Sequence, residues 1–222
     1  MLRTPVYIVC SPRPAVGKTL VARLLTEFLA LARGQAIAFD LNLGEPSLVD
    51  FLPDLTETAD ISDTYGKMAL MDRLIVHDGL AKVVDLGFHA FDEFFQMCDE
   101  IGFTKEGDRR GIEPVLVYLA DHSRMAAQSH RMLRTTFPTT ALIAIDNEHV
   151  LRGDIPPGFT PARMLHLPAL PAFLKTYIDR VPFSFTGYLR DTSDTSAELY
   201  QWTRDNFSKL RDAGDNLRRY RV

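Results

Sequence analysis

The sequence predicts an α/β protein with three layers, α/β/α, built around a mainly parallel β-sheet. Two observations lead to this prediction. Short runs of β-branched, aromatic and other apolar residues recur along the chain, and helical patterns separate several of them. The runs are apolar at consecutive positions, as expected for strands of a parallel sheet that is covered on both faces. Strands that alternate with helices in this way predict helices on both sides of the sheet.

Length and composition fit one domain. The chain has 222 residues, of which 46% are hydrophobic and 24% charged, a mixture typical of globular proteins. We therefore interpret residues 1–222 as a single domain. The longest apolar runs are about 8 residues, short of the ~20 that span a membrane, and residues 1–5 lack the apolar centre of a signal peptide, so a cytoplasmic protein is expected. The formal net charge of −4 argues against nucleic-acid binding that depends on overall charge.

The first elements form a compact sequence unit. Residues 5–10 (PVYIVC) are a β-branched and aromatic run that stops at Ser-Pro, which indicates a buried strand entering a loop. From Lys18 the apolar residues recur at helical spacing until Gly34, a natural helix stop. A second strand follows at residues 35–40. A strand, a loop, a helix and a strand in this order predict two parallel strands.

The remaining elements continue the alternation. Further strands are predicted at residues 82–85, 114–119, 140–145 and 163–166, with helical patterns at 68–76, 88–101 and 123–137. The other details between residues 43 and 78, an acidic and turn-rich part, stay open. An aromatic stretch at 181–188 has no assigned role, and a charged C-terminal helix is predicted at about 193–219.

The loop after the first strand carries the main functional signal. Gly17-Lys18-Thr19 stands directly between a predicted strand and a predicted helix. In this setting backbone N–H groups at the start of the helix can hold a polyphosphate, a lysine can reach its β/γ oxygens, and a hydroxyl can ligate Mg²⁺. The sequence therefore predicts a nucleotide-binding loop, the P-loop. Its candidate binding residues are Ala15, Val16, Gly17, Lys18, Thr19 and Leu20.

The first half of this loop is unusual. Pro12 and Pro14 have no N–H group to donate, and Ala15 resists the positive φ that glycine adopts freely. The backbone N–H groups from Ala15 to Thr19 all remain. We therefore expect a stiffened loop that still binds a nucleotide.

Three motifs resemble those of one family. Residues 11–19 (SPRPAVGKT) resemble the deviant Walker A loop of the MinD/ParA class of P-loop ATPases, whose pattern is Lys-Gly-Gly-x-Gly-Lys-Thr. Residues 39–48 are similar to the Asp-x-Asp-x-Gln stretch after that family's second strand, with Asn42 in place of the second acid, and residues 83–87 resemble its Walker B strand and switch II. The resemblance implies a switch that binds ATP with Mg²⁺, hydrolyses ATP and forms a homodimer with nucleotide. It also implies a protein partner that reads loops near residues 43–65 and 87–95.

The resemblance also implies roles for single residues. Lys18 would neutralise β/γ oxygens, and Arg13, at the position of the signature lysine, would reach the phosphates of the second copy in a dimer. Thr19 would ligate Mg²⁺ and Asp85 would hold it through water, while Asp40 would orient the attacking water or the metal shell. The candidate catalytic residues are therefore Lys18, Asp40 and Arg13, and the candidate metal residues are Thr19 and Asp85. The two aspartates also fit a plainer interpretation, in which a carboxylate ends a strand and caps the next turn.

Two further positions are candidates for contacts with the base. Asn147 follows the strand at 140–145, where the family often reads adenine, and Pro168 lies in a segment that resembles the proline-bearing base loop. Ordinary turn chemistry explains both residues equally well.

Other functions remain open at this point. Residues 16–21 also resemble the loop of dethiobiotin synthetase, an ATP-dependent metabolic enzyme, and the prolines of the loop favour a scaffold that has lost its nucleotide. Basic residues of the C-terminal helix could touch DNA phosphates or a membrane surface. Acidic residues in the same helix dilute that charge, so we expect the helix to pack on the domain.

Overall fold

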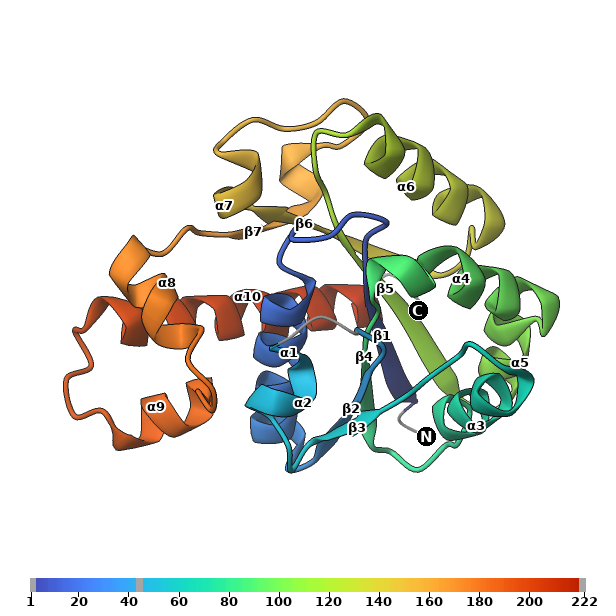
Figure 1. Ribbon diagram of the computed structural model, residues 1–222, viewed down its shortest axis with the longest axis horizontal. Helices are drawn as coiled ribbons and strands as arrows, with labels where there is room; N and C mark the ends of the chain where they lie inside the picture. The colour runs from blue at the N-terminus through green and yellow to red at the C-terminus, as the bar shows by residue number, and fades with distance from the viewer. Residues whose placement is uncertain (1–2, 43–45, 220–222) are drawn as a thin grey trace.

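A seven-stranded parallel sheet forms the centre of the computed structural model, which describes residues 3–42 and 46–219 (Figure 1). The strands lie in the order β3-β2-β4-β1-β5-β6-β7. Their bounds are β1 (Thr4–Cys10), β2 (Ala36–Asp40), β3 (Thr56–Thr58), β4 (Ala81–Asp85), β5 (Ile112–Leu119), β6 (Ala141–Asn147) and β7 (Met164–Leu167). Every pairing between neighbouring strands is parallel. The predicted sheet is confirmed.

Ten α-helices occur in the described residues, with short 3-10 turns at Phe88–Ala90 and Pro161–Arg163. They are α1 (Lys18–Arg33), α2 (Leu48–Phe51), α3 (Thr64–Leu74), α4 (Phe91–Glu100), α5 (Phe103–Arg109), α6 (Arg124–Thr136), α7 (Glu148–Leu151), α8 (Ala172–Ile178), α9 (Phe185–Asp191) and α10 (Glu198–Arg219). The C-terminal helix therefore begins about five residues later than predicted, after a turn that Asp194 closes by accepting from the N–H of Ser196. Leu43, Gly44 and Glu45 of the predicted switch segment lie outside the described residues, as do 220–222.

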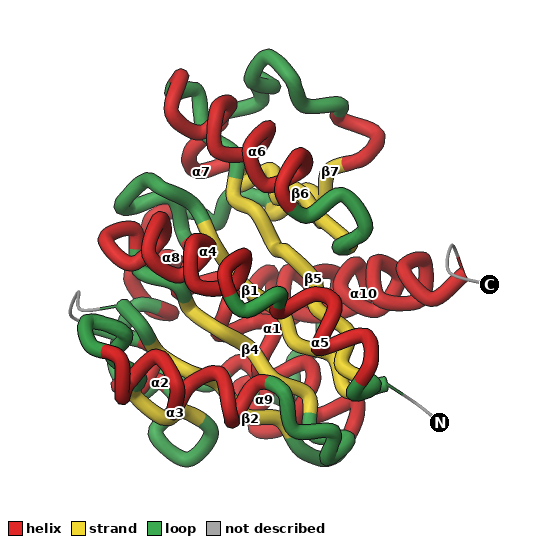
Figure 2. The backbone as a smooth tube through the Cα atoms, turned by 90° about the vertical axis from the view of Figure 1, so that its right-hand side faces the viewer, coloured by secondary structure: helices red, strands yellow, loops and turns green. Residues whose placement is uncertain are grey.

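The side chains of β1 alternate between two hydrophobic layers. Tyr7 and Val9 pack with α1, α2, α9 and α10, whereas Val6, Ile8 and Cys10 face α3, α4, α5 and α6. Figure 2 shows α4 and α5 in front of the sheet, with α1 and α10 behind it. This alternation follows from the two-residue period of a strand, and it confirms the predicted three layers.

The C-terminal helix packs against α1. Leu199, Trp202 and Phe207 are buried, and the ring centroids of Phe207 and Phe28 lie 5.8 Å apart. The predicted packing of this helix is therefore observed, while contacts with DNA or a membrane stay predictions. No helix within residues 3–42 and 46–219 combines the length and the apolar character needed to cross a bilayer.

The aromatic stretch at 181–188 also has a structural role. Phe183 and Phe185 are buried in the layer that contains α1. Ser184 caps α9 by accepting a hydrogen bond from the N–H of Gly187 at 3.0 Å. The stretch thus holds α9 beside α1 (Figure 1).

Candidate functional site

The loop between β1 and α1 ends in a left-handed residue. Gly17 has φ 94° and is the N-cap of α1, and no side chain caps this helix end. The first turn of α1 also contains no acidic residue. The N–H groups at the start of α1 are therefore available to an anion, and the helix dipole favours negative charge there.

Asn147, at the end of β6, holds this loop in place through a hydrogen bond from its side-chain amide. It is 3% exposed, its Nδ2 donates to the carbonyl of Val16 at 3.0 Å, and its Oδ1 accepts from the N–H of His149 at 3.2 Å. A Cβ atom on Gly17 would lie 2.4 Å from Nδ2 of Asn147, so only glycine fits here. The amide thus positions the loop, and its predicted contact with a base stays a prediction.

Ala15 has a backbone conformation that glycine adopts more easily. Its φ is 57°, in the left-handed region, where a side chain costs roughly 1–2 kcal/mol. The loop therefore keeps the path of a glycine-rich loop with a strained residue in it.

We expect Ala15→Gly to raise the free energy of unfolding by about 0.5–1 kcal/mol, because the strain removed exceeds the chain entropy that glycine adds to the unfolded state. Urea denaturation measures this change. Ala127→Gly, inside helix α6, is the matched control and should lose about 0.5–1 kcal/mol. A destabilised Ala15→Gly variant would show that the backbone at Ala15 is unstrained.

Lys18 reaches across the loop. Its side chain is buried, and Nζ donates to the carbonyl of Arg13 at 2.6 Å. Burial lowers the pKa of Lys18, and the negative charge of Asp85 opposes this effect. The ammonium group lies inside the loop, where it can exchange a carbonyl for a phosphate oxygen.

Thr19, Asp85 and Asn42 form a hydrogen-bonded chain beside the loop. The hydroxyl of Thr19 donates to Oδ2 of Asp85 at 2.7 Å and accepts from Nδ2 of Asn42 at 3.2 Å. Asp85 is fully buried, burial raises its pKa to about 7, and its Oδ1 has no hydrogen-bond partner. A buried carboxylate oxygen without a partner, next to a hydroxyl, fits the oxygen ligands that Mg²⁺ prefers.

Asp40 holds the segment that follows β2. Its Oδ1 accepts from the N–H of Asn42 at 2.9 Å and its Oδ2 from the N–H of Val49 at 3.0 Å. The side chain is 4% exposed. Asp40 therefore positions Asn42 against Thr19, which agrees with the capping interpretation of this aspartate. A role in orienting water stays a prediction.

Arg13 lies at the rim of the loop. Its side chain is 48% exposed, and its Nε is 3.9 Å from Oδ2 of Asp121. The guanidinium group is therefore accessible from outside the chain, and its predicted reach into a second copy stays a prediction.

A cavity of about 560 Å³ opens beside these groups. It extends from the loop over the first turns of α1, between the segment 46–51 on one side and α7 and α8 on the other. Of the predicted residues, Ala15, Gly17, Lys18, Thr19, Leu20 and Asn147 line it, whereas Arg13, Val16, Asp40, Asp85 and Pro168 do not. The lining also contains four charged or titratable residues that the sequence did not single out, namely Arg23, His149, Lys175 and Asp179.

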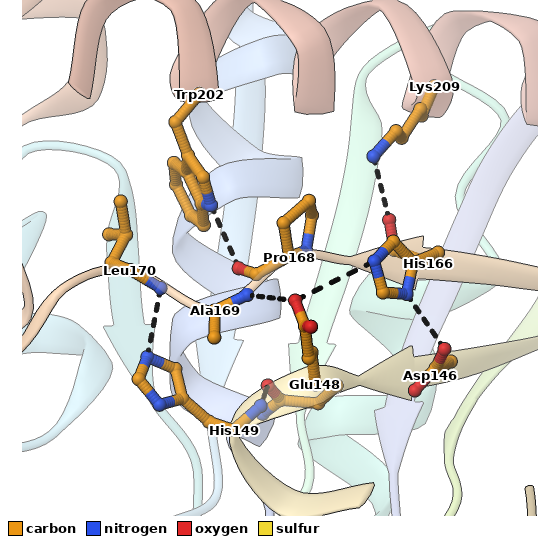
Figure 3. Close-up of polar contacts among 10 residues, drawn as sticks. Asp146, Glu148, His149, His166, Pro168, Ala169, Leu170, Trp202 and Lys209 are labelled. Carbon is orange, nitrogen blue, oxygen red and sulfur yellow. Dashed lines mark hydrogen bonds and ion pairs between the residues drawn. The ribbon is translucent and has the colours of Figure 1, made fainter. Parts of the chain in front are cut away.

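The loop after β7 is anchored to α7 and α10 (Figure 3). The carbonyl of Pro168 accepts from Nε1 of Trp202 at 2.9 Å. The next two N–H groups, of Ala169 and Leu170, donate to Oε2 of Glu148 and Nε2 of His149 at 2.8 and 3.1 Å. The structure therefore does not bring Pro168 together with the phosphate loop.

His166 connects β7 with β6 and α10 in the same region (Figure 3). Its Nδ1 is 2.7 Å from Oδ2 of Asp146, and its Nε2 is 3.8 Å from Oε2 of Glu148. Lys209 of α10 donates to its carbonyl at 3.0 Å. These contacts hold the edge of the sheet and the loop after it, so they support the site indirectly.

Comparisons with known proteins add one structural likeness. No protein-family model matches the chain, and no curated protein matches it. Chloroplast FtsY from Physcomitrella patens is among the similar solved structures, with 13% identity and a TM-score of 0.46 over 92% of this chain and 65% of that one. The chain thus spans slightly less than two thirds of the length of that structure. The structure itself shows a three-layer α/β/α fold with a parallel sheet, in which the loop between β1 and α1 occupies the strand–loop–helix position where a phosphate-binding loop is expected.

Proposed function

We propose that the chain is a nucleotide-dependent molecular switch of the MinD/ParA type, which binds ATP with Mg²⁺. The observation that carries the proposal is the convergence of Lys18, Thr19 and Asp85 at the open N-terminus of α1. Each group has the chemistry that a triphosphate requires: an ammonium group, a hydroxyl and a buried carboxylate beside free N–H groups.

The residues divide the work of binding. The N–H groups at the start of α1 hold phosphate oxygens, and Lys18 leaves the carbonyl of Arg13 for the β/γ oxygens. Thr19 and Asp85 are the residues that would hold Mg²⁺, since Oδ1 of Asp85 is buried without a partner. When bound, Mg²⁺ neutralises charge on the phosphates. For hydrolysis the chain mainly needs to position the phosphates and to neutralise their charge.

Two segments could report the bound nucleotide. Asn42 joins the segment after β2 to Thr19, and Leu41 donates its N–H to the carbonyl of Asp85 at 3.0 Å. A Cβ atom on Gly87 would lie 2.6 Å from the carbonyl of Leu41. Because the backbones at Leu41 and Gly87 are in contact, a shift of one requires a shift of the other. This coupling supports a switch that a protein partner reads.

The test of this function is calorimetric titration of ATP, ADP and GTP with Mg²⁺, together with sedimentation of each mixture. We expect wild-type protein to bind ATP and to dimerise with ATP alone. Lys18→Ala should weaken ATP binding about 100-fold, because it removes charge-assisted hydrogen bonds. The Arg13→Ala variant should still bind ATP but should no longer dimerise with it. Binding of ATP without dimerisation would exclude a switch that works through a nucleotide-dependent homodimer.

A scaffold without a nucleotide is the second candidate. The strained φ of Ala15 and the hydrogen bond from Lys18 to Arg13 favour it, because they show a loop whose lysine is satisfied within the chain. Absence of heat with every nucleotide, and no change in melting temperature, would support the scaffold over the switch.

A further inference from the structure

We propose that Lys175 and Asp179, on α8 and at its C-cap, recognise the hydrogen-bonding edge of the nucleotide base. This inference rests on the proposed binding of ATP and assigns its base-reading residues. Both residues line the same cavity as Lys18 and Thr19. The phosphate-binding groups and this pair therefore face one continuous space.

The cavity also has apolar walls that suit a flat ring. Its lining includes the apolar side chains of Leu20, Pro46, Phe51 and Val150. Binding sites for heteroaromatic ligands combine apolar walls with a few polar groups that fix orientation. A base that extends from phosphates held at Lys18 would have apolar walls beside it and the pair on α8 at its edge.

The pair offers a donor next to an acceptor. Nζ of Lys175 donates to Oδ2 of Asp179, one helical turn away, and the two side chains are 34% and 46% exposed. The remaining N–H groups of Lys175 and the other oxygen of Asp179 match the adjacent acceptor and donor of adenine, ring N1 and the 6-amino group. Because the charges of Lys175 and Asp179 cancel, the pair itself suits a neutral base better than an anionic group.

Buried Arg23 fixes the distance from this pair to the phosphate loop. Its guanidinium donates to the carbonyls of Ile178 and Phe183 at 2.8 and 3.2 Å and lies 3.7 Å from the ring centroid of Phe51. Burial lowers the pKa of Arg23 to about 10, so the group is still charged at neutral pH. Since α1 contains both Arg23 and the first turn after the loop, this one helix sets the distance between the phosphate loop and the pair on α8.

The two residues predicted from the sequence to contact the base are occupied elsewhere. The amide of Asn147 bonds to Val16 and His149, and the carbonyl of Pro168 bonds to Trp202. Pro168 is also outside the cavity lining. Lys175 and Asp179 offer the base two further polar side chains in the same cavity.

The experiment compares ligands with and without the base edge. Calorimetric titrations with Mg²⁺ use ATP, ITP, which has a carbonyl in place of the 6-amino group, and inorganic tripolyphosphate, which has no base. We expect wild-type protein to prefer ATP to ITP about tenfold, the effect of one good hydrogen-bonded pair. Asp179→Asn should weaken ATP binding about tenfold and remove the preference over ITP. Lys175→Met should also weaken the binding of ATP. Neither variant should change the affinity for tripolyphosphate by more than about twofold.

Matched controls separate this inference from the proposed function. Arg110→Met breaks a comparably exposed pair with Glu106 on α5 and should leave all three affinities unchanged. Equal losses for ATP and tripolyphosphate in Asp179→Asn, or no loss for either, would overturn the base-reading role alone. If wild-type protein binds neither ATP nor tripolyphosphate, the proposed function fails and the base-reading role fails with it.

Discussion

Replacing Glu27 with alanine is expected to lower the free energy of unfolding by about 3–5 kcal/mol, which makes it one of the most damaging single changes in this chain. Glu27 lies in α1 and is 1% exposed. Its oxygens accept hydrogen bonds from the hydroxyl of Ser184 and the N–H groups of Phe185 and Thr186 at 2.6, 3.0 and 2.8 Å. Alanine would leave these buried and partly buried donors at the start of α9 without their acceptor.

Urea denaturation measures this effect, and hydrogen exchange of residues 184–191 locates it. Glu27→Gln keeps one side-chain carbonyl as an acceptor and should lose only about 1–2 kcal/mol. Glu100→Ala, at an exposed position on α4, is the surface control and should stay within about 0.5 kcal/mol of wild type. If Glu27→Ala also stays within 1 kcal/mol, the segment 178–191 would be attached to α1 mainly by its aromatic side chains.

The sequence predicted those parts of the fold that have a strong local pattern. Six of the seven strands are apolar runs, and α1, α4 and α6 have helical spacing over ten or more residues. Strand β3 was missed because its three residues, Thr56–Thr58, are polar and lie at the edge of the sheet within a turn-rich part. Helices α8 and α9 have seven residues each, too few for a clear period. Their positions depend on tertiary contacts with Arg23 and Glu27.

The same distinction applies to the candidate site: some of its residues lie in local sequence motifs, and others reach the site only through tertiary contacts. Thr19, in the first turn of α1, and Asp85, at the end of β4, were predicted from short local motifs and from what their resemblance to a family of P-loop ATPases implies. The bracing role of Asn147 depends on the path of the loop, which leaves the carbonyl of Val16 in need of a donor. Lys175 and Asp179 come from a late segment that reaches α1 only through tertiary packing. One signal was present: Arg23 and Glu27 stand four residues apart in the mostly apolar run from Leu20 to Ala32, which indicates a buried polar pair.

Asp85→Asn is expected to stabilise the protein without ligands at pH 8 by about 2–4 kcal/mol. Burial raises the pKa of Asp85 from 3.8 to about 7, and the hydrogen bond from Thr19 offsets only part of this effect. Between pH 3.8 and about 7, the folded state binds more protons than the unfolded state, so the free energy of unfolding falls as the pH rises. The asparagine variant does not lose this stability. The difference in the free energy of unfolding between the variant and wild type should therefore be small at pH 4, increase up to pH 7 and stay constant above it.

Urea denaturation at several pH values, with a chelator present, measures that difference, and Asp99→Asn at an exposed position of α4 should give none. A constant difference across the range would show that Asp85 titrates normally. The same variant should lose the stabilisation that Mg²⁺ and ATP give to wild type, because a neutral amide is a weaker partner for a divalent cation than a carboxylate. A buried carboxylate that destabilises the empty protein is understandable if a bound cation offsets its charge. Opposite effects of one substitution, with and without Mg²⁺ and ATP, therefore test the metal site more directly than a loss of binding alone.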